Sequence, residues 1–246
     1  MTGENTPELS VVVPVFNERD NVAPLVSEIV AALRGRIPFE IVYVDDCSKD
    51  DSFAVLSQLM ASTPELRVLR HVAQSGQSSA IRNGVKAARG AWIATLDGDG
   101  QNDPADIPKL LDARDQADPA LKLFAGWRVQ RRDSGSKRWA STIANAIRSR
   151  LLRDETPDTG CGIKLFERAA FLDLPYFDHM HRYLPALIKR AGWQSVSVPV
   201  NHRERSTGVS KYNNLNRAWV GLADLRGVSW LIKRSKVTTA KEVERA

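Results

Sequence analysis

The sequence contains very little cysteine. Its 246 residues include only Cys47 and Cys161, which are too few for a disulfide framework and are not spaced like metal ligands. We therefore expect a protein that folds without disulfide bonds in a reducing compartment.

Long apolar runs are absent as well. No stretch of about 20 consecutive apolar residues occurs, so the sequence predicts no membrane-spanning helix. The first ten residues, MTGENTPELS, lack the basic region and the apolar stretch of a signal peptide. Together these absences predict a cytoplasmic protein.

No class of residue dominates the composition. A hydrophobic content of 43% and a charged content of 26% are ordinary for a globular chain, and they argue against disorder, collagen-like sequence and coiled coil. The length suffices for one large domain or two small ones. The net charge of +6 favours an anionic partner, which could be nucleic acid, a phosphorylated small molecule or an acidic membrane surface.

Strand-like and helix-like segments alternate through the first half of the chain. The expected strands cover residues 9–15, 39–46, 67–72 and 91–97, and the expected helices cover 21–35, 51–61 and 77–90. This alternation predicts an α/β fold with a mostly parallel central sheet and helices on both faces. Ligands bind beyond the carboxyl ends of such strands, so we expect the polar segments PVFNERDN, DDCSKDD and DGDGQND to converge on one crevice.

The second half of the chain is more basic. After an expected strand at 121–127, the segment 128–153 carries eight arginine and lysine residues and one acidic residue. The sequence then predicts a helix over 180–191, a strand over 194–200, a basic loop over 202–212 and an amphipathic helix over about 215–236.

The segment DGDGQND places the carboxylates of Asp97 and Asp99 on either side of one glycine. In an extended turn both carboxylates can face the same side, and Gly98 and Gly100 allow close backbone approach. Mg²⁺ typically takes one or two carboxylates together with substrate phosphates. The alternative is an ordinary Asp/Gly turn, but the position beside two other polar strand ends favours metal binding.

The segment VDDCSKDDS follows the second strand. Its carboxylates could cap the next helix, a role for which Asp50 or Asp51 is better placed than Asp45 or Asp46. A carboxylate at this strand end could instead accept hydrogen bonds from a base or a ribose. The first strand is followed by PVFNERDN and not by G-x-G-x-x-G, which argues against a dinucleotide-binding Rossmann site.

Four motifs in this order carry a family resemblance: VVVPVFNERDN, IVYVDDCSKDDS, ATLDGDGQNDP and RERSTGVSKY. The similarity covers about residues 9–232 and resembles glycosyltransferase family 2, especially its polyprenyl-phosphate sugar transferases of the dolichol-phosphate mannosyltransferase type. It implies a GT-A fold, a nucleotide-diphosphate sugar donor of the GDP-mannose or UDP-glucose type, and Mg²⁺ or Mn²⁺. The implied acceptor is undecaprenyl or dolichyl phosphate. The implied organisation is a tail (1–8), a GT-A catalytic domain (9–212), an amphipathic helical segment (213–236) and a second tail (237–246).

The resemblance also implies roles for individual residues. The nucleotide-sugar pocket would be lined by Pro14, Phe16, Glu18, Asp46 and Asp97, and the metal would be held by Asp97, Asp99 and Gln101. The acceptor phosphate would be bound by Arg128, Arg138, Ser141 and Ser210, and the catalytic residues would be Asp99, Arg205 and Lys211. Asp158 is a further candidate for an acceptor-side or sugar contact.

The remaining charged and reactive residues are interpreted more simply. We expect Arg148, Arg150 and Arg153 to form a solvated cationic face. We expect His179, His181 and His202 to serve in packing, and Cys161 to fit a tight turn without acting as a nucleophile.

The mechanism depends on the acceptor. A polyprenyl phosphate is already ionised and needs no general base, and direct displacement would invert the anomeric carbon. A glycan hydroxyl, the acceptor of other family members, would need a base, for which Asp158 is a candidate. A basic RNA-binding module or an inactive scaffold is the alternative outside enzymes, although acidic strand ends would repel nucleic acid.

The expected location is peripheral, on the cytoplasmic face of a membrane. The C-terminal segment combines an apolar stripe with Trp219 and Trp230 and closes with Lys233, Arg234 and Lys236, a composition typical of interfacial helices. A helix packed on the edge of the sheet is the alternative, in which case a separate membrane-embedded partner would supply the membrane contact.

Overall fold

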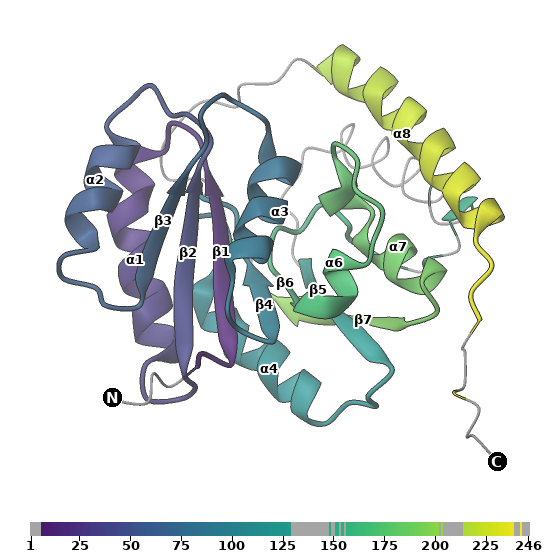
Figure 1. The fold of residues 1–246 in the computed structure, drawn as a ribbon, viewed down its shortest axis with the longest axis horizontal. Helices are drawn as coiled ribbons and strands as arrows, with labels where there is room; N and C mark the ends of the chain where they lie inside the picture. The colour runs from purple at the N-terminus through teal and green to yellow at the C-terminus, as the bar shows by residue number, and fades with distance from the viewer. Residues whose placement is uncertain are drawn as a thin grey trace.

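One sheet of seven strands runs through the molecule (Figure 1). The computed structural model describes residues 6–128, 148, 151–152, 154, 156–201, 203, 214–238 and 242, with the backbone alone for residues 214–219. The elements are β1 (Leu9–Val15), α1 (Arg19–Leu33), β2 (Phe39–Asp45), α2 (Ser52–Leu59), β3 (Leu66–Arg70), α3 (Gln77–Ala87), β4 (Trp92–Thr95), η1 (Pro104–Asp106), α4 (Ile107–Asp115), β5 (Leu121–Arg128), β6 (Lys164–Glu167), α6 (Arg168–Leu172), η2 (Met180–Arg182), α7 (Leu184–Arg190), β7 (Gln194–Val200) and α8 (Asn214–Arg234).

The sheet is mostly parallel, as the alternation of strands and helices predicted. Its order is β3-β2-β1-β4-β6-β5-β7. All neighbouring strands run parallel except β6, which is antiparallel to both β4 and β5. The sequence did not predict β6, because KLFE is four residues long with a charge at each end and offers no apolar run.

Helices cover both faces of the sheet (Figure 1). Alternate residues of β1 point to opposite faces, so Val11 and Val13 pack with α1, α2 and α4, whereas Val12 packs with α3 and with the later helices α6 and α7. The two apolar clusters confirm the predicted arrangement of a sheet between two helical layers.

The carboxyl ends of β2, β1 and β4 meet at one edge of the sheet. Val15 is in register with Asp45, and the Asp46 N–H donates to the Val15 carbonyl at 2.9 Å. On the other side of β1, the Leu96 N–H donates to the Val12 carbonyl at 3.3 Å. The three polar loops therefore do lie together, as predicted.

The helix expected at 180–191 is divided in two. The 3₁₀ turn η2 ends at Arg182, and α7 begins at Leu184 with Pro185 in its first turn. Proline suits that position because the first N–H groups of a helix have no partner within the helix.

The C-terminal helix α8 lies against α7 at the side of the molecule (Figure 1). Val228 is buried in the core cluster of that side, and Arg190 Nε donates to the Leu231 carbonyl at 3.1 Å. The packed-helix interpretation therefore holds for one face of α8, while Leu222 and Trp230 remain exposed. In the described ranges, no helix combines the length and the apolar character needed to cross a bilayer.

Candidate active site

The carboxylates of the DGDGQND segment lie in the loop after β4. The Asp97 N–H donates to Asn102 Oδ1 at 3.0 Å, and the Gln101 N–H donates to Asp99 Oδ1 at 3.1 Å, so the loop closes on itself. The loop also packs tightly against its surroundings. A methyl group on Gly98 would lie 2.8 Å from the Pro14 carbonyl oxygen, which explains why a glycine separates the two carboxylates.

Asp97 is held by groups from two other elements. Gln77, the first residue of α3, donates from Nε2 to Asp97 Oδ1 at 2.7 Å. Gly162, just before β6, packs so closely that a methyl group there would overlap the Asp97 carboxylate and Asn102 Oδ1. The sequence pattern indicates neither residue, because each acts through a contact between segments far apart in the chain.

The charge of Asp97 is balanced by a buried lysine. Burial raises the pKa of Asp97, and the neighbouring Asp99 raises it further, whereas Lys164 opposes that rise. Lys164 itself is 4% exposed and donates from Nζ to the Cys161 carbonyl, and burial lowers its pKa. The sequence signal for this residue was a lysine in the otherwise apolar stretch GIKLF.

Asp97 and Lys164 line a cavity of about 200 Å³. Gln77, Cys161, His181 and Arg182 also contribute to its walls. Burial raises the pKa of the Cys161 thiol, which agrees with the prediction that this cysteine is no nucleophile. The cavity thus joins the carboxylate loop to the segment around η2.

His181 has a more specific place than packing. Its Nδ1 lies 2.7 Å from Ser78 Oγ on α3, and its ring lines the cavity. Burial lowers its pKa well below the ordinary value, and Lys164 and Arg182 lower it further, so the ring is uncharged at neutral pH.

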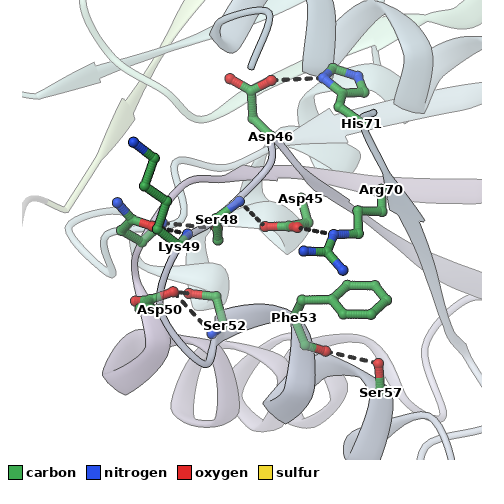
Figure 2. A network of polar contacts seen from close by, with 11 residues as sticks. Asp45, Asp46, Ser48, Lys49, Asp50, Ser52, Phe53, Ser57, Arg70 and His71 are labelled. Atoms are coloured by element: carbon green, nitrogen blue, oxygen red, sulfur yellow. Dashed lines mark hydrogen bonds and ion pairs between the residues drawn. The ribbon is translucent and has the colours of Figure 1, made fainter. Parts of the chain in front are cut away.

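Asp46 lies at the end of β2, where the resemblance implies a nucleotide contact (Figure 2). Its Oδ1 accepts from the Ser75 N–H at 2.8 Å and lies 2.7 Å from His71 Nδ1, and its Oδ2 accepts from the Gly76 N–H at 2.8 Å. Asn83 Nδ2 lies 2.9 Å from His71 Nε2 on the other side of the ring. Asp46 therefore fixes the loop that leads to Gln77.

Asp45 has a structural role beside it. Its Oδ1 accepts from the Ser48 N–H at 3.1 Å, and Oδ2 lies 3.3 Å from Arg70 Nε. Arg70 in turn lies over the ring of Phe53, 4.2 Å from its centroid (Figure 2). Asp51 is the N-cap residue of α2 without a capping hydrogen bond from its side chain, and the preceding Asp50 accepts from the Ser52 N–H through Oδ1 at 3.0 Å.

Hydrogen bonds join the loop after β1 to the segment after β2. The Asn17 N–H donates to Ser48 Oγ, and the Glu18 N–H donates to Ser52 Oγ, each at 3.0 Å. The Glu18 carboxylate accepts from Asn21 Nδ2 at 2.8 Å. Pro14, Phe16 and Glu18 are therefore brought to the same edge of the sheet as Asp97.

Arg128 and Asp158 form a two-pronged ion pair. Arg128 Nε donates to Asp158 Oδ2 at 2.7 Å and Nη2 donates to Oδ1 at 2.9 Å. Burial alone would lower the pKa of Arg128, but the Asp158 carboxylate outweighs it and raises that pKa. Because both oxygens of Asp158 face the guanidinium, this carboxylate is poorly placed to act as a general base.

The expectation for Arg148 was wrong. Its side chain is buried and its Nη1 donates to Asp154 Oδ2 at 2.5 Å, so it belongs to an internal ion pair and not to a solvated face. The sequence could not show this, because the charge pattern of the basic segment does not reveal which arginine folds back onto Asp154, the residue that follows the segment. Several other expected residues lie outside the described part of the chain: Arg138, Ser141, Arg150, Arg153, His202, Arg205, Ser210 and Lys211.

Known structures share this fold. A mannosyltransferase from Pyrobaculum calidifontis, solved with GDP-Man and Mn²⁺, superposes with a TM-score of 0.66 at 19% identity over 96% of this chain and 67% of its own. Glucosyl-3-phosphoglycerate synthase from Mycobacterium tuberculosis, solved with Mg²⁺ and UDP, gives a TM-score of 0.68 at 16% identity over 95% of this chain and 81% of its own. The fold is that of the GT-A glycosyltransferases.

Sequence comparison gives the family. Residues 10–174 match the model for glycosyl transferase family 2. Dodecaprenyl-phosphate galacturonate synthase from Rhizobium johnstonii is 33% identical over 94% of this chain and 70% of its own length. Undecaprenyl-phosphate 4-deoxy-4-formamido-L-arabinose transferase from Edwardsiella ictaluri is 33% identical over 83% of this chain and 62% of its own length. The chain belongs to glycosyltransferase family 2, and it spans less than three quarters of the length of either relative.

Proposed function

We propose that the protein transfers a sugar from a nucleotide-diphosphate donor to the phosphate of a polyprenyl lipid. The observation that carries this proposal is the pair Asp97 and Asp99, which lies at the carboxyl end of β4 and adjoins a cavity with two cationic side chains. The names of the two bacterial relatives support the acceptor class, since both contain a polyprenyl phosphate. Those names contain different sugars, galacturonate and formamido-arabinose, so the mannose of the family resemblance is not specifically supported.

The carboxylate pair suits a divalent cation. Asp99 raises the pKa of Asp97, which shows that the two carboxylates are close enough to repel each other. In the described ranges, no group of three or more His, Cys, Asp or Glu side chains could form a full protein cage. Mg²⁺ and Mn²⁺ need no such cage when a diphosphate supplies ligands, and Asp97, Asp99 and Gln101 would hold the ion. When bound, the cation would neutralise the charge of the departing nucleoside diphosphate.

The residues of this chain would mainly align the acceptor phosphate with the sugar and stabilise the departing diphosphate. Arg128 is held by Asp158 at the end of β5, next to Gly160 of the cavity wall, and would attract the acceptor phosphate. The acceptor oxygen is ionised, so attack on the anomeric carbon needs no proton transfer, and one displacement inverts that centre. Arg138, Ser141, Arg205, Ser210 and Lys211 remain predicted contacts to phosphate.

Transfer to a glycan hydroxyl is the rival function. It would need a general base near the anomeric carbon. Of the described residues that line the cavity, Asp97 faces the expected cation, and His181 has a strongly lowered pKa and is a weak base. Asp158 lies outside the lining and is paired with Arg128. These three features favour the phosphate acceptor.

The test is a transfer assay with radiolabelled nucleotide sugars. Purified full-length chain would be incubated with Mg²⁺ or Mn²⁺ and with undecaprenyl phosphate, dolichyl phosphate or soluble glycans. We expect label in the lipid fraction that mild acid releases as free sugar. Label only in the glycans would contradict the proposal and support the hydroxyl acceptor.

A further inference from the structure

We propose that the cavity beside Asp97 is the subsite for the transferred sugar, and that Lys164 and Arg182 select a sugar that carries a carboxylate, a hexuronate. This inference rests on the proposed transferase function, because it names the donor of the same site.

The position and size of the cavity suit a single sugar ring. Asp97 forms part of its wall, so a diphosphate bound at the carboxylate loop would place the anomeric carbon at the cavity. Its volume of about 200 Å³ is smaller than the roughly 300–1,000 Å³ of pockets that hold a drug-sized ligand. The nucleoside must therefore lie outside the cavity, toward the loops after β1 and β2.

The cavity has an excess of positive charge. Lys164 and Arg182 are its cations, Asp97 is its one carboxylate within the described chain, and the His181 ring is uncharged. A divalent cation bound by Asp97 and Asp99 would neutralise the Asp97 carboxylate, which would then no longer compensate the charge of Lys164. The Cys161 carbonyl accepts a hydrogen bond from Lys164 but carries no charge to balance it. The Asp158 carboxylate also acts on Lys164 but is paired with Arg128, so once a cation is bound at Asp97 an anionic ligand would compensate the buried ammonium.

Arg182 supplies the geometry for a carboxylate. Arg182 is half-buried and lines the cavity, and no hydrogen bond or ion pair joins its side chain to another described residue. A guanidinium matches the two oxygens of a carboxylate with parallel hydrogen bonds. Arg128, by contrast, is already paired with Asp158 and would have to share its donors.

The test compares donors that differ only at C6 of the sugar. Binding of UDP-galacturonate against UDP-galactose, UDP-glucuronate against UDP-glucose, and GDP-mannuronate against GDP-mannose would be measured by calorimetry with Mn²⁺ present. In at least one pair we expect the uronate to bind about tenfold to a hundredfold more tightly, the effect of one or two charge-assisted hydrogen bonds.

Variants assign that preference to the two cations. Lys164→Met and Arg182→Leu should each reduce the uronate-to-neutral ratio by about tenfold. Lys86→Met and Arg89→Leu change exposed cations on and just after α3 and should leave the ratio unchanged. Circular dichroism would check folding. If the Lys164→Met variant at the buried site does not fold, the Arg182→Leu variant at the half-buried site still tests the inference.

The outcomes separate this inference from the proposed function. Equal or weaker uronate binding in every pair, no binding of any donor, or a preference that survives both variants would overturn the inference. An effect of the variants on the KM for undecaprenyl phosphate with an unchanged donor ratio would assign the cations to the acceptor and also overturn it. Transfer of a neutral sugar to lipid would then leave the proposed function standing. A uronate preference without lipid transfer would uphold the inference and refute that function.

Discussion

Asp97 and Asp99 are separated by one residue but lie in different surroundings. Asp97 is held from outside its loop by Gln77, whereas the Asp99 carboxylate accepts a hydrogen bond from the Gln101 backbone of the same loop. The difference allows each carboxylate to be tested for a separate property, Asp99 for function and Asp97 for stability.

Asp99→Asn should abolish transfer without unfolding the protein. The change removes one negative charge from the expected cation site but keeps an oxygen that can accept the Gln101 N–H. We expect kcat to fall at least about a hundredfold, the usual effect of losing an electrostatic contact to the leaving group. Asp173→Asn, at an exposed carboxylate on the surface, is the matched control. Turnover at the wild-type rate with metal present would refute the assignment.

Asp97→Asn should stabilise the metal-free protein at neutral pH. The pKa of Asp97 is raised by burial and by Asp99, so the folded state resists ionisation of this group. Such a group favours folding below its unfolded pKa, and that contribution is lost as pH rises through its folded pKa. Asparagine carries no such charge. In urea unfolding with EDTA, the free energy of unfolding of the variant should exceed that of the wild type by an amount that grows between about pH 4 and pH 8. An advantage that is independent of pH would mean that the charge is not its cause.

At the scale of elements, the site depends on a close contact between the β4 loop and the segment before β6. Gly162→Ala should disrupt it, because a methyl group would overlap Asp97 and Asn102. We expect a loss of about 1–3 kcal/mol in the free energy of unfolding, typical of overpacking, together with reduced activity. Gly221→Ala on α8 meets no atom within 4 Å and should be neutral or stabilising by up to about 1 kcal/mol. Urea denaturation of both variants checks the contrast, and equal stabilities would contradict the close packing.

An element could be predicted when a few neighbouring residues determine it, and could not be predicted when it depends on pairing with distant segments. The strands β1 and β2 are apolar runs bounded by polar turns, so the pattern of a few residues located them and the loops after them. The strand β6 is short and charged, and its place between β4 and β5 depends on pairing with segments far away in the chain. Lys164 and His181 were missed as cavity residues for the same reason. The position of Asp97 and Asp99 after β4 could be predicted, because both carboxylates lie in one short segment next to an apolar strand.

For the whole molecule, the proposed lipid acceptor requires contact with a membrane surface, and no helix in the described ranges can span a bilayer. The exposed face of α8 carries Leu222 and Trp230, and the helix ends with Lys233 and Arg234. Arg234 lies 5.9 Å from the centre of the Trp230 ring, so apolar and cationic groups are adjacent. This combination is typical of helices that lie at a bilayer surface.

We therefore predict salt-sensitive binding to liposomes that contain anionic lipid. Each basic residue near an anionic surface contributes about 1 kcal/mol, and salt screens that attraction over about 10 Å at 0.1 M. Removal of α8 would also uncover the core around Val228, so point variants are the cleaner test. Trp230→Ala and Lys233→Gln should weaken co-sedimentation, whereas Met60→Ala, at an exposed apolar residue just after α2, should not. If the full-length chain stays in the supernatant at low salt, direct docking is wrong, and a membrane-embedded partner would have to bring the enzyme to its acceptor. If it binds and the α8 variants bind equally well, the contact lies elsewhere on this basic chain, and the basic segments 128–153 and 202–212 would be the next to test.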